Sequence, residues 1–249
     1  MKPDEAERWF VNESLQPCSA ILAELCRLPG EDRAARAAWL LGTRIVNSAR
    51  SIECLVSAEH ESIFDAVAII RTAYDALIQL LYILDDHSRR NERAGLYLDF
   101  LWIEKHHLRD VIDQSDTDIG RRLAGSPMRA AGETALEHQL LQLGPQYETR
   151  NGKYRKKWYK ETLRDLAKAV GYESEYDILQ LKTSAFVHSG CMPLLTGSFI
   201  KPQYATDWAI RFSHRACDAI IRTFAINVNE EFSLILAHAR RNIFDAPDA

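Results

Sequence analysis

The chain is poor in the residues that interrupt helices: its 249 residues include only 11 glycines and 8 prolines. Because tight turns depend on these residues, their scarcity predicts long helices joined by short connections. Apolar residues recur with helical periodicity from end to end, and no stretch alternates apolar and polar residues as a half-buried strand would. We therefore predict an all-α fold, an irregular multi-helix bundle with residues 1–249 in a single domain.

Cysteine is also scarce, with five residues scattered along the chain and no pair in Cys-x2-Cys spacing. An odd, dispersed set is typical of reduced thiols in a cytoplasmic protein. Zinc-binding spacings, glycine-rich phosphate loops and G-x-S-x-G nucleophile elbows are absent as well. The sequence thus predicts no metal and no cofactor. Cys191 is the one cysteine near a histidine in a predicted loop (His188), which is thin support for a cysteine nucleophile.

No charge of one sign dominates, since the formal net charge is −4 with 27% charged residues. This balance argues against a surface that binds nucleic acid everywhere, although it leaves room for a local basic patch. Uninterrupted apolar runs of about 18 residues are missing too. The nearest candidate, Ile63–Leu84, carries Arg71 and Asp75 at mid-length, which would be costly in lipid. We expect a cytoplasmic protein without a membrane partner.

That same segment is the most distinctive feature of the sequence, and we predict a central apolar helix at about 59–85. On a helical wheel its polar residues occupy roughly one third of the circumference, and the rest is apolar. These polar residues are Asp65, Arg71, Thr72, Asp75, Gln79 and Tyr82. A helix that is apolar over so much of its surface is normally central in its domain. Its polar stripe then faces solvent through a slot or lines an interior groove, and both interpretations stay open.

Arg71 and Asp75 lie one helical turn apart and form the first candidate site. As a plain surface ion pair they would contribute a few tenths of a kcal/mol. Arg before Asp is, however, the poorer orientation for such a pair. In a groove, Arg71 is suited to bind an anionic group bidentately while Asp75 orients it.

We predict one long C-terminal helix over Thr206–Arg240, which carries a second polar stripe along an apolar body. The stripe consists of Arg211, Arg215, Asp218, Arg222 and Asn229. Facing the stripe of the central helix, it would complete an arginine-rich groove in which Arg211 and Arg215 bind substrate. The alternative is an ion-paired interface between helices or between the subunits of a homodimer.

The predicted helix Glu173–Val187 and the residue that follows supply a third set of candidates: Tyr176, Lys182, Ser184 and His188. A cation near a helix C-terminus is favoured by the helix dipole. Because Ser-Gly follows His188, we expect its ring to face a cleft, where it would serve as a general acid or base. The alternative is that His188 only caps the helix.

A run of six cations interleaved with tyrosine and tryptophan spans residues 150–160. Such a composition holds phosphate backbones and stacks bases. The substrate-binding candidates in it are Lys153, Arg155, Lys156, Lys157 and Trp158. The alternative is a solvated linker whose aromatic residues anchor it to the core. Elsewhere, Glu104 and His107 form an E-x-x-H, but a di-iron site needs a second such motif, and the sequence has none.

Taken together, Arg71-x3-Asp75 on an apolar helix, Trp158 after a basic segment, and Ser184-x3-His188 resemble the bacterial all-helical family called domain of unknown function 5677. In that family an acidic residue, usually Glu, follows the arginine at this spacing, so Asp75 is a shortened version. The resemblance spans roughly Arg44 to Phe232. It implies an all-helical fold but no established activity.

Members of the family look similar to helical nucleotide- and RNA-related domains of prokaryotic defence and toxin systems. Nucleases of that kind carry Arg-x(4–6)-His on one helix, used in pairs across a dimer. No arginine of this chain has a histidine at that spacing, and Lys182-x5-His188 is the nearest approach. The leading prediction is a homodimeric enzyme acting on RNA or a nucleotide phosphodiester. The alternative is a non-catalytic helical scaffold or sensor.

Overall fold

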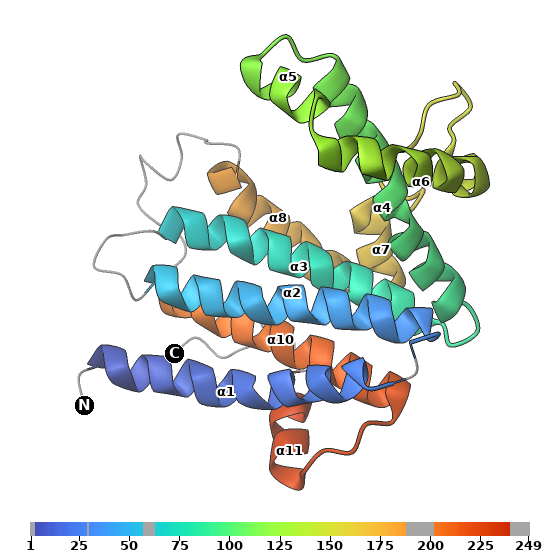
Figure 1. Cartoon of the computed structure of the whole chain (residues 1–249). Coiled ribbons are helices and arrows are strands. Elements are labelled where there is room, and N and C mark those ends of the chain that lie inside the picture. Colours follow the sequence, from blue (N-terminus) through green and yellow to red (C-terminus); the bar gives the residue numbers. More distant parts are fainter. Residues whose placement is uncertain (1–2, 29, 57–62, 188–201, 240–249) are drawn as a thin grey trace. The chain divides into compact units, whose positions relative to one another are not determined.

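The computed structural model describes residues 3–28, 30–56, 63–187 and 202–239. Over these ranges it consists of helices, with one isolated β-bridge (Glu148 to Tyr154) and no strand (Figure 1). The all-α prediction is confirmed. The helices are α1 (Pro3–Cys26), α2 (Arg33–Val56), α3 (Ile63–Asp85), α4 (Arg90–Asp113), α5 (Asp118–Ala124), α6 (Pro127–Leu143), the 3-10 helix η1 (Gly144–Tyr147), α7 (Leu163–Ala169), α8 (Glu173–Val187), α10 (Pro202–Phe224) and α11 (Glu230–Ala239).

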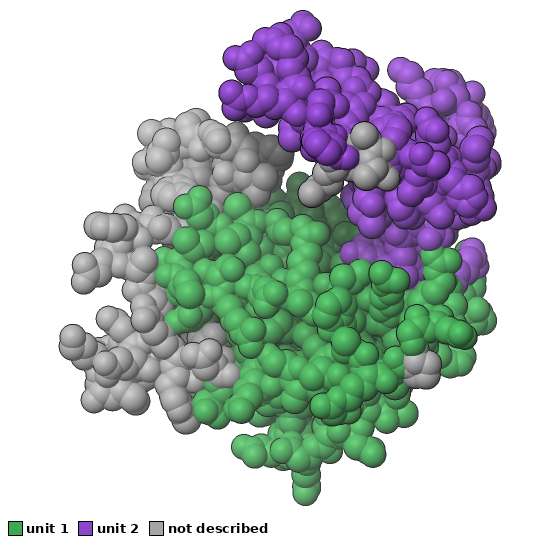
Figure 2. Space-filling model, viewed as in Figure 1, with its two compact units in different colours: residues 1–91, 161–249 green, residues 92–160 purple. Residues whose placement is uncertain are grey.

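The chain divides into two compact units (Figure 2). Unit 1 comprises residues 1–91 and 161–249, and unit 2 comprises residues 92–160. Each unit is described by itself below. The single domain expected from the sequence stays a prediction.

Helix α3 is the central helix of unit 1, as predicted. It packs against α2, α7, α8 and α10, and Figure 1 shows it lying between α2 and α8. Most of its apolar residues are buried, and Ile70, Leu77 and Ile78 have zero exposure. Within the described residues, Asp65–Asp85 is the one window long and apolar enough to cross a membrane, and 56% of it is buried inside the protein. Burial of that extent is what the core helix of a bundle shows.

Helix α2 packs closely against two neighbouring helices at Gly42. A Cβ atom at this position would lie 2.7 Å from Leu22 Cδ2 on α1 and 3.3 Å from Ile220 Cδ1 on α10. Such distances leave no room for a side chain, so glycine lets α2 approach both neighbours.

The C-terminal segment corrects the sequence prediction. The continuous helix expected over Thr206–Arg240 is wrong, because α10 ends at Phe224 and α11 begins at Glu230. Ala225 has a positive φ of 52°, which stops the first helix. Asn229 Oδ1 accepts a hydrogen bond from the Phe232 amide (2.8 Å) and so caps the second. Asn229 therefore does not belong to the polar stripe of α10.

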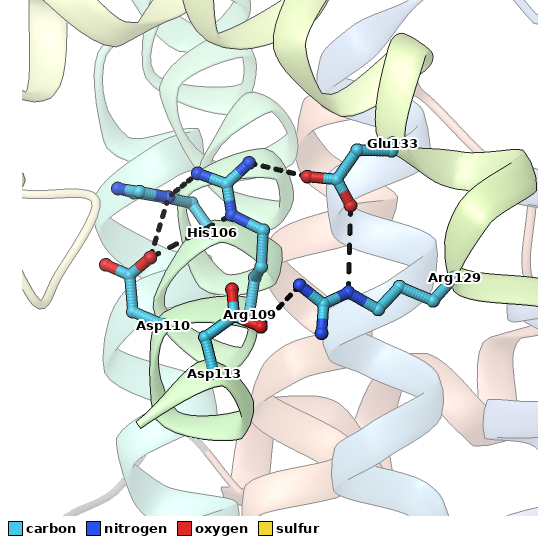
Figure 3. Close-up of polar contacts among 6 residues, drawn as sticks. All are labelled: His106, Arg109, Asp110, Asp113, Arg129 and Glu133. Carbon is cyan, nitrogen blue, oxygen red and sulfur yellow. Dashed lines mark hydrogen bonds and ion pairs between the residues drawn. The ribbon is translucent and has the colours of Figure 1, made fainter. Parts of the chain in front are cut away.

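In unit 2, α4 and α6 are joined by arginine–carboxylate pairs (Figure 3). Arg109 of α4 donates from Nη1 to Glu133 of α6 (2.8 Å). Arg129 of α6 reaches back to Asp113 (2.6 Å) and also lies 3.7 Å from Glu133. Because the pairs form one connected network across two helices, they fix the register of α6 on α4 better than an isolated surface pair would.

His106 stands at the edge of this network, between partners of opposite charge. Its Nδ1 lies 2.9 Å from Arg109 Nη2 and 3.4 Å from Asp110 Oδ1. Only the neutral ring has an Nδ1 lone pair that accepts from Arg109. Burial lowers the pKa of His106, Asp110 opposes this shift, and Arg109 and His107 add to it. The folded protein thus favours the neutral imidazole.

We expect the free energy of unfolding to decrease as the pH falls below about 6.5, the ordinary pKa of histidine. The unfolded chain takes up the proton first, so the stabilisation is complete above that value and is lost as the pH falls through the lower folded pKa. His214, whose pKa burial also lowers, contributes in the same direction. Urea denaturation at pH 7.5 and 5.5 measures the difference.

The variant His106→Gln keeps a hydrogen-bond acceptor without titrating, and it should lose less stability between the two pH values than the native chain. His138→Gln is the matched control, since His138 is exposed on α6 and hydrogen-bonds Gln142. An equal pH dependence in native protein and His106→Gln would contradict the assignment.

Candidate functional site

Arg71 and Asp75 do pair on α3, and the arginine is held from a second side as well. Arg71 Nε lies 3.0 Å from Asp75 Oδ1, with side-chain exposures of 14% and 31%. Arg71 Nη2 donates to the hydroxyl of Tyr176 on α8 (2.8 Å), and the guanidinium carbon lies 4.8 Å from the centre of that ring. The polar stripe of the central helix is thus half-buried under α8, between the two placements left open by the sequence.

The third nitrogen of the same guanidinium has no such partner. Arg71 Nη1 is buried, and within the described part of the chain no acceptor hydrogen-bonds to it. A buried charged donor without an acceptor costs free energy, and native proteins rarely keep one without a bound water, an ion or a functional use. Asp75 and Tyr176 therefore hold the guanidinium in place, while its Nη1 group lacks a hydrogen-bond acceptor among the described residues.

A buried ion pair lies behind this arginine and connects α8 with α10. Arg215 Nη1 donates to Glu175 Oε1 (2.5 Å), and each side chain is only 2% exposed. The guanidinium of Arg215 also lies 5.2 Å from the centre of the Tyr172 ring. Buried charges must be paired in this way, because an isolated one would be strongly disfavoured.

Tyr74 of α3 links the two arginine sites. Its ring lies 6.4 Å from that of Tyr176 and 5.0 Å from that of Phe212, measured between centroids. Burial raises the pKa of Tyr74, and the negative charge of Glu175 raises it further. Tyr74 therefore stays a neutral phenol, and α3, α8 and α10 meet around one polar cluster in an apolar interior.

The sequence did not point to Glu175, Tyr74 or Tyr172. Glu175 lies in the first turn of α8, where an acidic residue is expected for the helix dipole alone. Tyr74 belongs by periodicity to the apolar face of α3. No local pattern distinguishes a tyrosine that lies near a buried carboxylate from one that only packs, so only the tertiary structure reveals this part of the cluster.

The polar stripe on α10 is paired along its length. Arg211 Nε lies 3.0 Å from Asp207 on its own helix, and Arg222 lies 2.9 Å from Asp218. With Arg215 bound to Glu175, every arginine of the predicted stripe has a carboxylate partner. These pairs neutralise the positive groove expected from the sequence.

A cleft of about 530 Å³ does lie between α3 and α10, but at their C-terminal ends. Its walls bring together Asp85, His87, Tyr172 and Arg222 above apolar residues such as Leu81. Arg71 is not among its lining residues. Because the cleft presents a carboxylate and a guanidinium together, its charge does not select a ligand of one sign.

The remaining candidates of α8 lie at or beyond its described end. Lys182 is exposed, with Nζ 5.7 Å from the centre of the Trp208 ring. Ser184 belongs to α8, but its side chain lies outside the described residues, as does all of His188. The expected role of His188 as a general acid or base facing a cleft stays a prediction.

The basic run lies in unit 2 and folds back on itself. The Arg155 amide donates to the Tyr147 carbonyl (2.9 Å), and the Thr149 amide donates to the Lys153 carbonyl (2.7 Å). Gly152, with a φ of 69°, makes the turn. We call residues 147–160 the basic hairpin.

Its aromatic residues and its lysines have different surroundings. Trp158 is only 4% exposed and meets the ring of Tyr97 edge-on, at 5.8 Å between centroids. Arg155 is held as well, donating from Nη2 to the Gln146 carbonyl (2.8 Å). The other three substrate-binding candidates are exposed: Lys153, Lys156 and Lys157. The burial of Trp158 does not favour the base-stacking role that its sequence context suggested.

Comparison with known families places the chain. A family model described as "Family of unknown function (DUF5677)" matches residues 36–201 of the 249. The chain belongs to this family. No curated protein and no solved structure matches it. The DUF5677 match includes Arg71, the basic hairpin and α8, and it ends before α10, so Arg211 and Arg215 lie outside it. The predicted family membership is thus confirmed, over a range that begins and ends earlier than the expected Arg44 to Phe232.

The described part of this DUF5677 chain contains no group of three or more His, Cys, Asp or Glu residues placed to hold a metal ion. His107 of the E-x-x-H instead places its Nε2 3.1 Å from the Arg155 carbonyl, so it anchors the basic hairpin to α4. Its position gives it a structural role in unit 2.

Proposed function

We propose that this DUF5677 protein binds the phosphate group of RNA or of a nucleotide at Arg71 and acts on the phosphodiester bond. The observation that carries the proposal is the state of the Arg71 guanidinium. Asp75 and Tyr176 hold it from two sides, while Nη1 is buried without an acceptor among the described residues. A donor fixed in advance stabilises developing negative charge without having to reorganise.

The other residues take roles that follow from their chemistry. Asp75 and Tyr176 orient Arg71, and Lys182 adds positive charge. His188 is the general acid or base, because histidine alone among the candidates exchanges a proton near neutral pH. By the same proposal the protein is a cytoplasmic, homodimeric member of a bacterial defence or toxin system.

A cleavage assay on end-labelled RNA tests this directly, comparing native protein with Arg71→Ala, Arg71→Lys and His188→Ala. We expect each variant to lower the rate by about 10²-fold or more, since removing a general acid–base or a charge-stabilising donor has effects of this order. Lysine should not rescue, because it lacks the planar fork of donors. Arg50→Ala, which removes an exposed arginine of α2, is the control and should keep full activity.

Circular dichroism on each variant checks that the substitution has not unfolded the protein. Equal rates for all folded variants would sink the enzyme proposal. The inability of native protein to cleave RNA or any nucleotide diester would do the same.

A second candidate function, a non-catalytic helical scaffold or sensor, is favoured by a different observation. Arg215 contacts Glu175 across two helices, and Arg211 and Arg222 pair along α10. The Arg215–Glu175 pair holds α8 against α10, and the three pairs together occupy the arginines of the α10 stripe that a substrate would otherwise bind. Folded variants with unchanged rates would leave this candidate as the function.

A further inference from the structure

The basic hairpin is a local concentration of positive charge on an acidic protein. Residues 147–160 contain six lysines and arginines and a single acidic residue, Glu148, whereas the whole chain carries a net charge of −4. Five of the cations are exposed: Arg150, Lys153, Lys156, Lys157 and Lys160. The hairpin is therefore a small basic surface within unit 2.

The exposed lysines belong to a hairpin whose backbone is held by hydrogen bonds. Backbone hydrogen bonds join Tyr147 to Arg155 and Thr149 to Lys153. The hydroxyl of Tyr147 donates to the Leu96 carbonyl of α4 (2.7 Å), and His107 contacts the Arg155 carbonyl. Because the hairpin is held at several points, its cations keep their spacing and lose little freedom on binding.

We infer that the basic hairpin docks the sugar–phosphate backbone of RNA, so that the ligand of this protein is a polymer and not a free nucleotide. The inference rests on the phosphate-bearing ligand proposed above and makes it more specific. Several exposed cations on one rigid element match a chain of phosphates, whereas a mononucleotide carries its charge at one end. The dominant contribution is then electrostatic and independent of base sequence.

The four aromatic residues of the hairpin are all engaged within unit 2: Tyr147 and Trp158 are buried, and the partly exposed Tyr154 and Tyr159 make ring contacts with His106 and Trp158. Trp158 and Tyr147 are packed inside unit 2 and not available for stacking on bases. Proteins that grip single strands through their bases need exposed aromatic platforms. Docking on an anionic membrane surface would likewise call for exposed aromatic or aliphatic side chains beside the lysines. We therefore expect the hairpin to contact phosphate groups and not bases, so that duplex RNA binds about as tightly as a single strand.

Fluorescence anisotropy with labelled 20-nucleotide RNA, titrated at several salt concentrations, tests the inference on the full chain. The variant Lys153→Gln/Lys156→Gln/Lys157→Gln should bind at least about tenfold more weakly. Its slope of log affinity against log salt should be smaller by about two, at roughly 0.7 per lost phosphate contact. The control Arg36→Gln/Arg44→Gln/Arg50→Gln removes the same charge from exposed positions of α2 and should bind like native protein.

The inference is overturned if the lysine variant binds like native protein, or if the control variant is weakened equally. It is also overturned if native protein binds phosphatidylserine vesicles but not RNA, or a mononucleotide as tightly as the 20-mer. Failure of the proposed function gives a different result, because the variant Arg71→Ala keeps the hairpin and is expected to keep its RNA binding. RNA that binds but is never cleaved would remove the enzyme proposal and leave the docking surface standing.

Discussion

Replacing Glu175 with leucine should lower the free energy of unfolding by about 3–5 kcal/mol, the usual cost of removing one partner from a buried ion pair. Glu175 and Arg215 are both 2% exposed. Without the carboxylate, the positive charge of Arg215 stays buried between α8 and α10 and loses its ion-pair partner Glu175. Urea denaturation followed by circular dichroism at pH 7.5 measures the loss.

The double variant Glu175→Leu/Arg215→Met tests whether the loss of stability comes from the unpaired buried charge or from the change of side chains at this place. Two apolar side chains of similar size leave no buried charge, so most of the lost stability should return. The exposed pair between Arg164 and Asp177 is the matched control, because its bidentate hydrogen bonds face water. Asp177→Asn should therefore change the stability little. A double variant no more stable than Glu175→Leu would contradict this account.

The second large effect is expected in the core of unit 1, from Leu77→Ala on α3. Leu77 is completely buried in the middle of the helix that α2, α8 and α10 surround. Truncation removes apolar contacts and leaves a cavity that closely packed helices cannot close, which costs about 2–5 kcal/mol. The expected result is a lower urea midpoint with an unchanged dependence on urea concentration.

Leu181→Ala on α8 is the control for this prediction, since Leu181 is 80% exposed and supports no packing. Its effect should stay within about 0.5 kcal/mol. Similar losses from the two substitutions would show that α3 is not the centre of the unit.

Helices α3 and α8 followed from sequence pattern alone. The periodicity that predicted a helix over Glu173–Val187 matches α8 residue for residue, and the apolar run at about 59–85 is α3. Local signals of this kind depend on backbone geometry and side-chain burial within one segment. The break after Phe224 also has a local signal, because Asn229 followed by Glu230 and Glu231 is typical of a helix N-terminus. The apolar periodicity continues across this point, however, and led to the prediction of one continuous helix.

In the candidate site, too, the features within one segment were predicted from the sequence, whereas the contacts between helices were not. Sequence alone singled out Arg71 with Asp75, one turn apart on a single helix, and the basic hairpin as a run of like charge. Only the tertiary structure decided that Tyr176 holds Arg71, that Glu175 takes Arg215 out of the predicted groove, and that Trp158 is buried. Contacts within one helical turn are fixed by the helix repeat, whereas contacts across helices depend on which faces pack together. That pairing is a property of the whole fold, and no single segment carries it.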